Sequence, residues 1–550
     1  MSLLPQIVYA VPEETARIAR AAFPKSNPYL RLADRLGVIY QDGDFAQLFP
    51  FAGQPALAPV RLALTTILPF AEGLSDRQTA DAVRGRMDWK YLLCLELTDP
   101  GFDASVLCEF RARLLAGGAE ELLLTKLLTL CQEMGWLKAR GRQRTDSTHI
   151  LAAVRMLNRL ERVGETLRAA LNEVAAVAPD WLRVRAPAEW YERYARRIEN
   201  YHLPKSDAAR AHYAAQAGCD GEALLGWLDE PDTDPPLRAL ARVQTLRQIW
   251  AEQFTTTAQG LRLRDVKEMP AVADLLASPY DVDARWSTKR DLEWVGYKVH
   301  LTETCEPDQP HLITEVTTTP ATTPDDNMLA PIHAKLAARE LLPAEHLVDK
   351  GYTSAEVLVA AQKDYDVQIV GPVAADPSWQ ARLSPAFAKA QFQVDWERRV
   401  VTCPTGKESH PWLPQGDPGT GVVWQARFAK AACTPCPQRA QCTHAKVEPR
   451  LIGLQPRAQE EALQKRRAEQ TTPEFRAAYA ARAGIEGTHS QGVRRCDLRQ
   501  ARYLGLVKTH LQQILTAVAL NLLRLAEWLI ERPLAKTRVS AFAALKPAPA

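Results

Sequence analysis

The chain reads Gln143-Arg-Thr-Asp-Ser-Thr-His149 where a short β-prone run ends at an acidic residue, Asp146. It reads His346-Leu-Val-Asp-Lys-Gly-Tyr352 where a second such run ends at Asp349. In α/β sheets, reactive groups gather beyond the ends of the strands. We therefore expect the two carboxylates to meet at one end of a sheet.

A third acidic residue, Glu486, lies in a helical pattern, Tyr479-Ala-Ala-Arg-Ala-Gly-Ile-Glu-Gly487. Each acid alone has an ordinary explanation, as a turn, a cap or a solvated helix residue. Together, carboxylates from two strands and a helix form a hard-oxygen site for paired Mg²⁺. Such a pair can activate a nucleophile on one side of a phosphodiester and stabilise the leaving oxygen on the other.

The segments around these residues alternate in the order of a mixed α/β layer. The expected elements are a strand at 142–150, a hairpin of 294–303 and 311–319, a helix at 325–339 capped by Asp325, a strand at 345–348, a helix at 354–363 and a strand at 367–373. The order strand, hairpin, helix, strand, helix, strand is that of a sheet of the ribonuclease H type.

The other segments are expected to form units around this core. In the N-terminal helices, Ser75 and Gln78 form a capping-box pattern. Basic helix edges there fit a helix-turn-helix-like DNA reader, although an ordinary helical bundle fits the pattern equally well. Helical periodicity is also expected from about 151 to 276 and from about 457 to 529. The predicted units are an N-terminal helical DNA-binding domain (1–140), the first strand of the catalytic domain (141–150), a helical insertion (151–280), the catalytic core (281–373), a β-rich insertion that carries cysteines (374–457), the C-terminal helices of the catalytic domain (458–531) and a disordered tail (532–550).

The composition is that of a large globular chain. It has 550 residues, of which 46% are hydrophobic, and a net charge of only +3. This size supports two to four domains at about 150 residues each, and the charge balance alone does not demand nucleic acid. The first ten residues do not resemble a secretory signal, and the apolar run 511–530 is too polar to span a bilayer. We expect a soluble, cytoplasmic protein with no membrane partner.

Four of the ten cysteines lie between residues 403 and 442. Their spacing, Cys433-x2-Cys436-x5-Cys442 with Cys403 upstream, suits a tetrahedral Zn²⁺ site. His410 and His444 are possible substitute ligands, and a reduced Pro-rich loop or an iron–sulfur centre are the alternatives. The role of the metal would be structural, because the insertion has few apolar residues for a core of its own.

Basic residues follow Glu486 closely. They are Arg494, Arg495, Arg499, Arg502 and Lys508. We expect a basic helical surface that binds DNA, because phosphate contacts supply most sequence-independent affinity. The alternative is a solvated amphipathic face.

The three acidic stretches together resemble the signature regions of the DDE transposases of bacterial insertion sequences. In one branch of that family the third region reads Tyr-x2-Arg-x3-Glu-x6-Lys, and this chain has Tyr479, Arg482 and Glu486 at that spacing. Val493 stands where Lys is expected, and two arginines follow it. The resemblance extends to 294–300, 325–327 and 496–511 and spans most of the chain from about residue 50.

The resemblance implies a ribonuclease H-like DNA transposase that cuts element ends and joins them to target DNA by hydrolysis and transesterification. Asp146, Asp349 and Glu486 would hold two Mg²⁺, with Mn²⁺ as a substitute. Tyr479 and Arg482 share a helical face with Glu486 and would contact phosphate. The expected partners are double-stranded DNA, from element ends and target, and a second copy of the chain, since two ends must be cut together. When bound to DNA, the protein would be associated with the nucleoid.

Two further functions remain open from the sequence. One is a metal-dependent DNA nuclease without strand transfer. The other is a catalytically inactive, transposase-derived DNA-binding protein, against which the intact set of acids argues.

Overall fold

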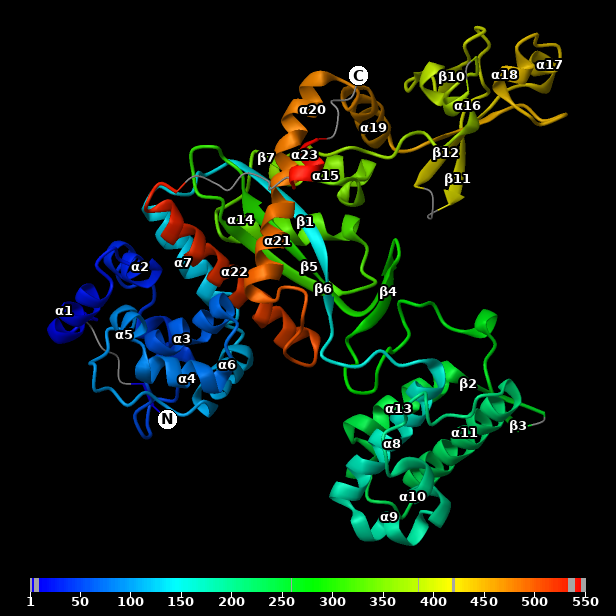
Figure 1. The fold of residues 1–550 in the computed structure, drawn as a ribbon. Helices are drawn as coiled ribbons and strands as arrows, with labels where there is room; N and C mark the ends of the chain where they lie inside the picture. The colour runs from blue at the N-terminus through cyan, green and yellow to red at the C-terminus, as the bar shows by residue number, and fades with distance from the viewer. Residues whose placement is uncertain are drawn as a thin grey trace.

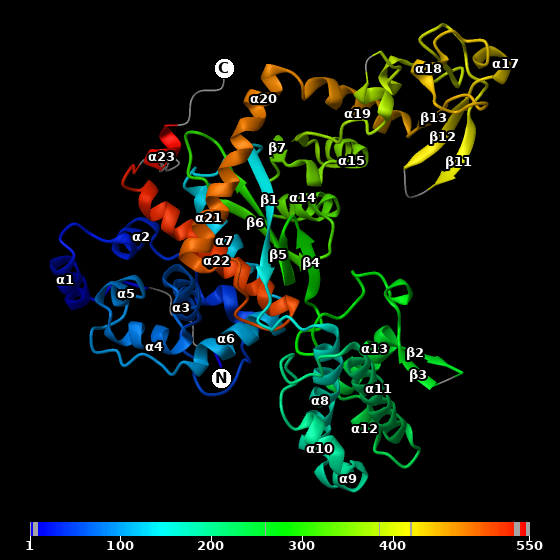
Figure 2. The same cartoon turned by 45° about the vertical axis from the view of Figure 1, so that its right-hand side comes forward.

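A mixed β-sheet lies at the centre of the molecule, with helices packed on it and two units projecting from it (Figure 1). The computed structural model describes residues 2–3, 9–258, 260–383, 385–417, 421–532 and 540–545. The helical insertion and the cysteine-bearing insertion lie on separate sides of the sheet in both views (Figures 1 and 2). The predicted mixed α/β core with inserted units is thus present.

The strands of the central sheet are β1 (Arg142–Leu151), β4 (Arg285–Lys289), β5 (Leu292–Thr304), β6 (Ile313–Pro320), β7 (Glu345–Val348) and β8 (Gln368–Val370). The main order is β6-β5-β1-β7-β8, and β4 pairs with the beginning of β5. The pairs β1–β5 and β5–β6 are antiparallel, whereas β1–β7 and β7–β8 are parallel. The predicted succession of strands is confirmed, and β4 is an additional strand.

Between β6 and β8 lie η3 (Asp325–Met328), α14 (Leu329–Ala338), η4 (Lys350–Tyr352) and α15 (Ala355–Tyr365). The prediction that Asp325 caps the first of these helices is wrong. Pro324 occupies the N-cap position, and the Asp325 carboxylate instead lies 3.0 Å from Lys298 Nζ and accepts a 3.2 Å hydrogen bond from Ser147 Oγ. The Asp325 carboxylate thus pairs with Lys298, a partly buried lysine on β5 that needs a counter-charge.

The N-terminal segment is helical, as predicted. Its helices are α1 (Glu13–Ala22), α2 (Pro28–Leu36), η1 (Asp42–Leu48), α3 (Pro59–Glu72), α4 (Asp76–Gly85), α5 (Met87–Leu92), α6 (Ser105–Ala116) and α7 (Leu122–Glu133). The capping box of α4 is confirmed: the Ser75 N–H donates to Gln78 Oε1 at 2.9 Å, and the Gln78 N–H donates to Ser75 Oγ at 3.4 Å.

The long helix α22 (Leu506–Trp528) joins the N-terminal helices to the sheet (Figure 2). Buried residues of α3, α7, α22 and β6 belong to one continuous hydrophobic core. Asn521 is fully buried in α22, where its side chain accepts from the Ile313 N–H and donates to the Ile313 carbonyl, both at 2.8 Å. In the described part of the chain, no helix has the length and apolarity that crossing a membrane would require.

The helical insertion has a core of its own. It consists of α8 (Arg159–Val177), α9 (Pro179–Arg185), α10 (Ala188–Tyr194), α11 (Asp207–Asp229), α12 (Pro235–Arg238), α13 (Ala241–Gln253), a hairpin of β2 (Phe254–Thr257) and β3 (Gly260–Leu263), and η2 (Val266–Glu268). The prediction of helix up to residue 276 is wrong beyond residue 253. The run Phe254-Thr-Thr-Thr257 forms a strand instead, since β-branched residues favour extended backbone.

The cysteine-bearing insertion is built from short elements: α16 (Trp379–Arg382), η5 (Lys389–Gln391), β9 (Gln393–Asp395), β10 (Val400–Thr402), β11 (Leu413–Asp417), β12 (Val422–Arg427), α17 (Lys430–Cys433), α18 (Arg439–Cys442) and β13 (Leu451–Leu454). β11, β12 and β13 form one small sheet, and β9 and β10 form another. A small separate core holds them together. The β-rich character predicted for this segment is confirmed.

The C-terminal region forms α19 (Arg457–Glu469), α20 (Pro473–Ala480), η6 (Ala481–Ala483), α21 (Gly484–Cys496), α22 and α23 (Ala541–Ala544). The prediction that Arg494 to His510 lie on one continuous helix is wrong. α21 ends at Cys496, because Asp497 adopts a left-handed conformation with φ of 50°. Residues 497–505 then run beside β1, where the Leu151 N–H donates to the Arg499 carbonyl at 2.8 Å. Of the tail predicted to be disordered, 533–539 and 546–550 lie outside the described residues.

Candidate active site

Asp146 and Asp349 lie side by side because of the strand register. β1 and β7 are parallel neighbours, and Thr145 pairs with Val348. Asp146 and Asp349 follow this last pair, so both lie where the pairing of β1 with β7 ends. Asp146 is not at the end of its strand, as the sequence suggested, because β1 continues to Leu151 against β5. Asp146 Oδ1 accepts the Ser147 N–H at 2.9 Å, and Asp349 Oδ1 accepts the Gly351 N–H at 2.8 Å.

Helix α21 packs beside β1 (Figure 1). Glu486 lies in the first turn of α21, near Asp146 and Asp349. The guanidinium of Arg482, in the turn η6, contacts all three acids. Its Nη2 lies 2.8 Å from Asp146 Oδ2 and 3.7 Å from Asp349 Oδ2, and its Nη1 donates to Glu486 Oε1 at 3.3 Å. We call Asp146, Asp349 and Glu486 the acidic cluster. Three residues that are far apart in the sequence thus surround one cation.

The acidic cluster is open to solvent on one side. The exposed fraction of the side chain is 12% for Asp146, 34% for Asp349 and 69% for Glu486. Burial raises the pKa of Asp146 to about 6, although Arg482 lowers it, and the neighbouring charge of Asp349 raises it further. A second cation would stabilise the charged form of Asp146, because it would offset both the cost of burial and the repulsion from Asp349.

Two polar side chains lie at the edge of the acidic cluster. Tyr479, in α20, is half-buried and stacks on Phe475 with ring centroids 5.8 Å apart. Burial raises its pKa, so the hydroxyl keeps its proton and can donate to an oxygen. His489, in α21, is buried with Nδ1 4.0 Å from Asp146 Oδ2, and burial lowers its pKa to about 4. No described residue bonds its Nε2.

A buried ion cluster fixes α21 on the sheet. Glu303 of β5 is fully buried, with Arg144 Nη2 at 2.7 Å and Arg524 Nη1 at 2.8 Å. Thr488 Oγ1, two residues after Glu486, donates to Glu303 Oε2 at 2.5 Å. Arg144 Nη1 also donates to the Ala481 carbonyl at 2.5 Å, next to Arg482. These residues were not predicted; their one signal in the sequence is Glu303, an acid inside the apolar, β-branched run of β5.

Two family models match this chain. The model described as Transposase DDE domain matches residues 402–526, which include Glu486 and the four clustered cysteines. The model described as Transposase domain (DUF772) matches residues 18–113, which form most of the N-terminal helices. Both matches support an insertion-sequence DDE transposase. Asp146 and Asp349 lie outside both matched ranges. No curated protein matches the chain, and no solved structure does.

The two matches confirm the predicted resemblance to an insertion-sequence DDE transposase, and of the three acidic stretches they include only the one with Glu486. They support a transposase function in general, which implies a DNA substrate, and DDE transposases generally use divalent metals such as Mg²⁺. The donor atoms of the acidic cluster fit such an ion: they are carboxylate oxygens, and they already surround a cation. Within the described residues, no group of three His, Cys, Asp or Glu side chains is arranged to coordinate a metal directly. In the acidic cluster, the Arg482 guanidinium lies between the three carboxylates.

The transposase places its predicted DNA-binding residues in two settings. Arg494, Arg495 and Lys508 are exposed. Arg499 and Arg502 are used by the fold: Arg499 Nε donates to Thr148 Oγ1 at 2.9 Å, and Arg502 Nη1 donates to the Leu74 carbonyl at 3.0 Å. Arg502 also lies over the Phe70 ring, 4.7 Å from its centroid. Arg499 therefore connects the segment between α21 and α22 to β1, and Arg502 connects it to the N-terminal helices.

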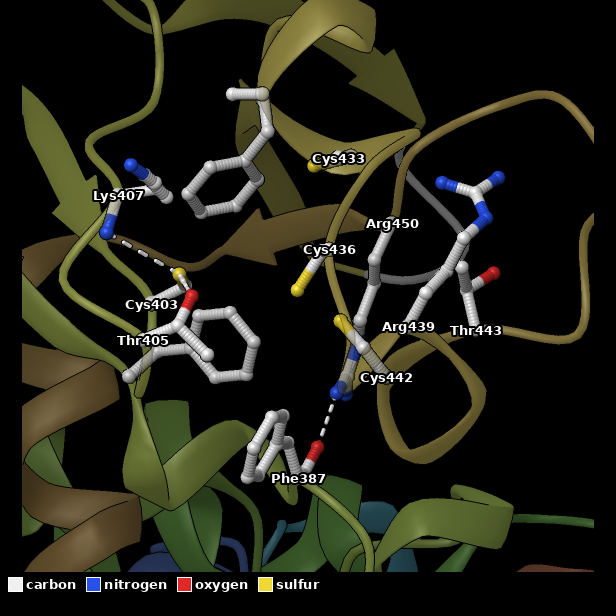
Figure 3. Close-up of a pocket in the computed structure, with 13 residues that line it drawn as sticks. Phe387, Cys403, Thr405, Lys407, Cys433, Cys436, Arg439, Cys442, Thr443 and Arg450 are labelled. Carbon is white, nitrogen blue, oxygen red and sulfur yellow. Dashed lines mark hydrogen bonds between the residues drawn. The ribbon is translucent and has the colours of Figure 1, made fainter.

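The four clustered cysteines line one cavity of the transposase (Figure 3). Cys403 follows β10, Cys433 ends α17, Cys436 lies in the next turn and Cys442 ends α18. Cys403 Sγ accepts the Lys407 N–H at 3.4 Å and lies 3.1 Å from Thr405 Oγ1. Burial, with neighbouring thiols, raises the pKa of Cys433. All ten cysteines are free of disulfides. The substitute His444 stacks on Trp379, with ring centroids 3.8 Å apart.

Proposed function

We propose that this chain is an active DDE transposase, which cleaves the DNA at the ends of an insertion sequence and joins the freed 3′ ends to target DNA. The observation that carries the proposal is the convergence of Asp146, Asp349 and Glu486 on one guanidinium. The strand order β6-β5-β1-β7-β8, in which β5 runs antiparallel to the other four strands, supports a ribonuclease H-like catalytic core.

In this mechanism the acidic cluster holds two Mg²⁺, which Mn²⁺ can replace. When bound, such ions lower the pKa of a water or a 3′-hydroxyl and neutralise charge on the leaving oxygen. Asp146 and Asp349 would provide oxygen ligands where the pairing of β1 with β7 ends, and Glu486 would provide an exposed one on α21. The Tyr479 hydroxyl donates a hydrogen bond to a phosphate oxygen. The Arg482 guanidinium binds a phosphate when the guanidinium moves away from the acids.

The other units serve DNA binding and assembly. The N-terminal helices recognise the element ends, and the exposed Arg494, Arg495 and Lys508 contact DNA phosphates, with Arg499 and Arg502 beside them. Two ends must be cut together, so the active form is a homodimer or larger assembly on double-stranded DNA. The two insertions shape the DNA channel or the dimer. In a cell the DNA-bound enzyme is associated with the nucleoid.

Cleavage and joining of DNA by the purified protein test this function. The substrate is a supercoiled plasmid that carries the DNA flanking the gene on both sides, with Mg²⁺ added. We expect nicks at the element ends and transfer of a labelled 3′ end to a second plasmid. Asp146→Asn, Asp349→Asn and Glu486→Gln should each lower the cleavage rate by about 10³-fold or more, since they act as one unit.

The outcomes separate the alternatives. Cleavage without transfer of the labelled end would identify a nuclease. DNA binding without cleavage in either Mg²⁺ or Mn²⁺ would identify a DNA-binding relic. Cleavage that survives all three substitutions would place the active site elsewhere.

We also propose that Cys403, Cys433, Cys436 and Cys442 hold a structural Zn²⁺. Their shared cavity supports this, as does the small core of the insertion, in which seven buried hydrophobic residues belong to one cluster. Thiolate ligands in a unit of this size contribute folding energy through the metal. The cysteines must close on the ion, because the described residues hold no preformed metal-binding set.

Metal analysis of the purified protein tests this site. We expect about one Zn²⁺ per chain, as four thiolates complete a tetrahedral site, and its loss in Cys433→Ser. The control is Cys108→Ser, which replaces an exposed cysteine of α6 outside the insertion and should leave the metal content unchanged. Iron with visible absorbance would identify an iron–sulfur centre, and a metal-free protein would exclude the site.

A further inference from the structure

The Arg482 guanidinium occupies the position at which one cation can contact all three acids. Its Nη2 contacts Asp146 and Asp349, and its Nη1 contacts Glu486. The exposed fraction of its side chain is only 14%, so the charge faces the carboxylates rather than water. A divalent ion bound by the same oxygens would meet a positive charge within about 4 Å, where repulsion between like charges is strong.

On the basis of the proposed function, we propose that Arg482 acts as a lock on the metal site, which means that it blocks metal binding while no DNA is bound. In the DNA-free protein its guanidinium neutralises the acidic cluster and competes with divalent ions. A DNA phosphate that enters the site draws the guanidinium away, and the carboxylates then become free to bind the ions. Metal binding is therefore linked to DNA binding through one side chain.

The local structure allows Arg482 to leave. It lies in η6, a turn of three residues between α20 and α21. Neither η6 nor α20 has a fully buried residue, but their apolar side chains pack on a small core of Cys305, Leu347 and Val370. The movement that frees the guanidinium is therefore a rotation of the Arg482 side chain, with the backbone in place. The guanidinium is also incompletely bonded, because its Nε is buried and no described residue accepts a hydrogen bond from it. A phosphate could accept two parallel bonds from the same group.

The surroundings of the acids favour exchange of one cation for another. Glu486 and Asp349 are open to solvent, so a phosphate and an ion can reach the cluster from outside. Asp146, Asp349 and α21 are held by the strand register and by the Glu303 ion cluster, and neither depends on Arg482. The carboxylates should therefore stay in place when the guanidinium leaves. The lock keeps the enzyme from loading ions, and so from nicking, until a phosphate is present.

The test is the Mn²⁺ affinity of the full-length, DNA-free protein, measured from the electron paramagnetic resonance signal of free Mn²⁺. Arg482→Gln removes the competing charge and should tighten Mn²⁺ binding about tenfold, within the usual range of coupling between sites. Arg482→Lys keeps a charge and should fall between the two. The control is Arg476→Gln. Arg476 is an exposed arginine of α20 that donates to the Thr471 carbonyl, and its substitution changes the net charge as much as Arg482→Gln does. The control variant should match the wild type.

A second pair of variants locates the gained affinity. Asp146→Asn in the Arg482→Gln background should abolish the gain. If Arg482→Gln binds Mn²⁺ no better than the wild type, while Asp146→Asn weakens binding in both backgrounds, the lock is refuted and the acidic cluster remains a metal site. If Asp146→Asn has no effect in either background, the metal site and the proposed mechanism both fail. Thermal melting of each variant verifies that the protein is folded.

The role of the phosphate is tested in the same assay. A duplex of element-end DNA should bring the Mn²⁺ affinity of the wild type to that of Arg482→Gln, after subtraction of the ions that the duplex binds alone. The duplex should leave the affinity of Arg482→Gln unchanged. An equal gain in both proteins would overturn the linkage through Arg482.

Discussion

Thr488 Oγ1 donates a hydrogen bond of 2.5 Å to Glu303 Oε2, and this bond joins the helix that carries Glu486 to the middle of the sheet. Glu303 also binds Arg144, two residues before Asp146, and Arg524 of α22. One buried carboxylate thus connects both of the main elements that build the acidic cluster. Glu303 is a positioning residue, because it touches α21 and β1 and none of the three acids.

Glu303→Ala should destabilise the protein. It leaves Arg144 and Arg524 buried without their shared counter-charge, and removal of one partner of a buried ion pair costs about 3–5 kcal/mol. Urea unfolding would measure the loss. Glu356→Ala, at an exposed position of α15, should change the free energy of unfolding by less than about 0.5 kcal/mol. Equal effects of the two substitutions would contradict the role of Glu303.

Gly484→Ala should disturb the acidic cluster through the backbone of α21. A Cβ at Gly484 would lie 2.0 Å from Arg144 Nη1 and would push this guanidinium away from Glu303 and Ala481. Overpacking of this kind costs about 1–3 kcal/mol, and we expect the cleavage rate to fall with it.

The matched control is Gly487→Ala on the same helix, where an added Cβ meets nothing within 4 Å. Alanine favours helix, so this variant should gain up to about 1 kcal/mol of stability. Thermal melting and plasmid cleavage compare the two variants. A Gly484→Ala protein that melts and cleaves like Gly487→Ala would show that Arg144 has room to move.

Two buried histidines should make the stability depend on pH. His333 Nε2 lies 2.9 Å from His346 Nδ1, and His346 Nε2 lies 2.6 Å from Thr145 Oγ1. Burial lowers the pKa of His333 to about 4 and that of His346 well below its usual range. The unfolded chain, with histidine pKa values near 6.5, therefore binds more protons between about pH 6.5 and pH 4. Stability is full above this window and falls as the pH drops through it.

Urea unfolding between pH 7.5 and pH 5 would measure this dependence. Each histidine that titrates only in the unfolded chain contributes at most about 1.4 kcal/mol per pH unit. His333→Asn removes one titrating group and should make the loss between pH 7.5 and pH 5 smaller. A wild type and a variant with parallel pH profiles would show that the histidines are not the cause.

Asn521→Leu should weaken the contact between α22 and the edge strand β6. The substitution leaves the Ile313 N–H and carbonyl buried without their present partner, and an unsatisfied buried group costs about 1–3 kcal/mol. Asn172→Leu is the control, since Asn172 is exposed in α8 and bonds only within its own helix. If both variants unfold at the same urea concentration, the Asn521 bonds contribute nothing.

Local sequence was sufficient for most of the elements. The β-branched and aromatic runs predicted β5, β6, β7 and β8, and the Ser75 capping box predicted the start of α4. These features depend on neighbours a few residues apart, so a single sequence contains them. The short β4 was missed, and the run of threonines in β2 was misread as helix. In both cases pairing across a hairpin decided the structure, and periodicity along the chain does not show such pairing.

Both the local sequence and the tertiary structure were needed to describe the acidic cluster. The sequence by itself determined which residues are the candidate acids, because motif spacing and the ends of apolar runs are local properties. Only the tertiary structure decided that Arg482 lies among Asp146, Asp349 and Glu486, that Glu303 anchors α21, and that Arg499 and Arg502 join parts of the fold. The physical reason is that a buried charge must find a partner wherever the fold provides one, and strand register and helix packing set that place far along the chain.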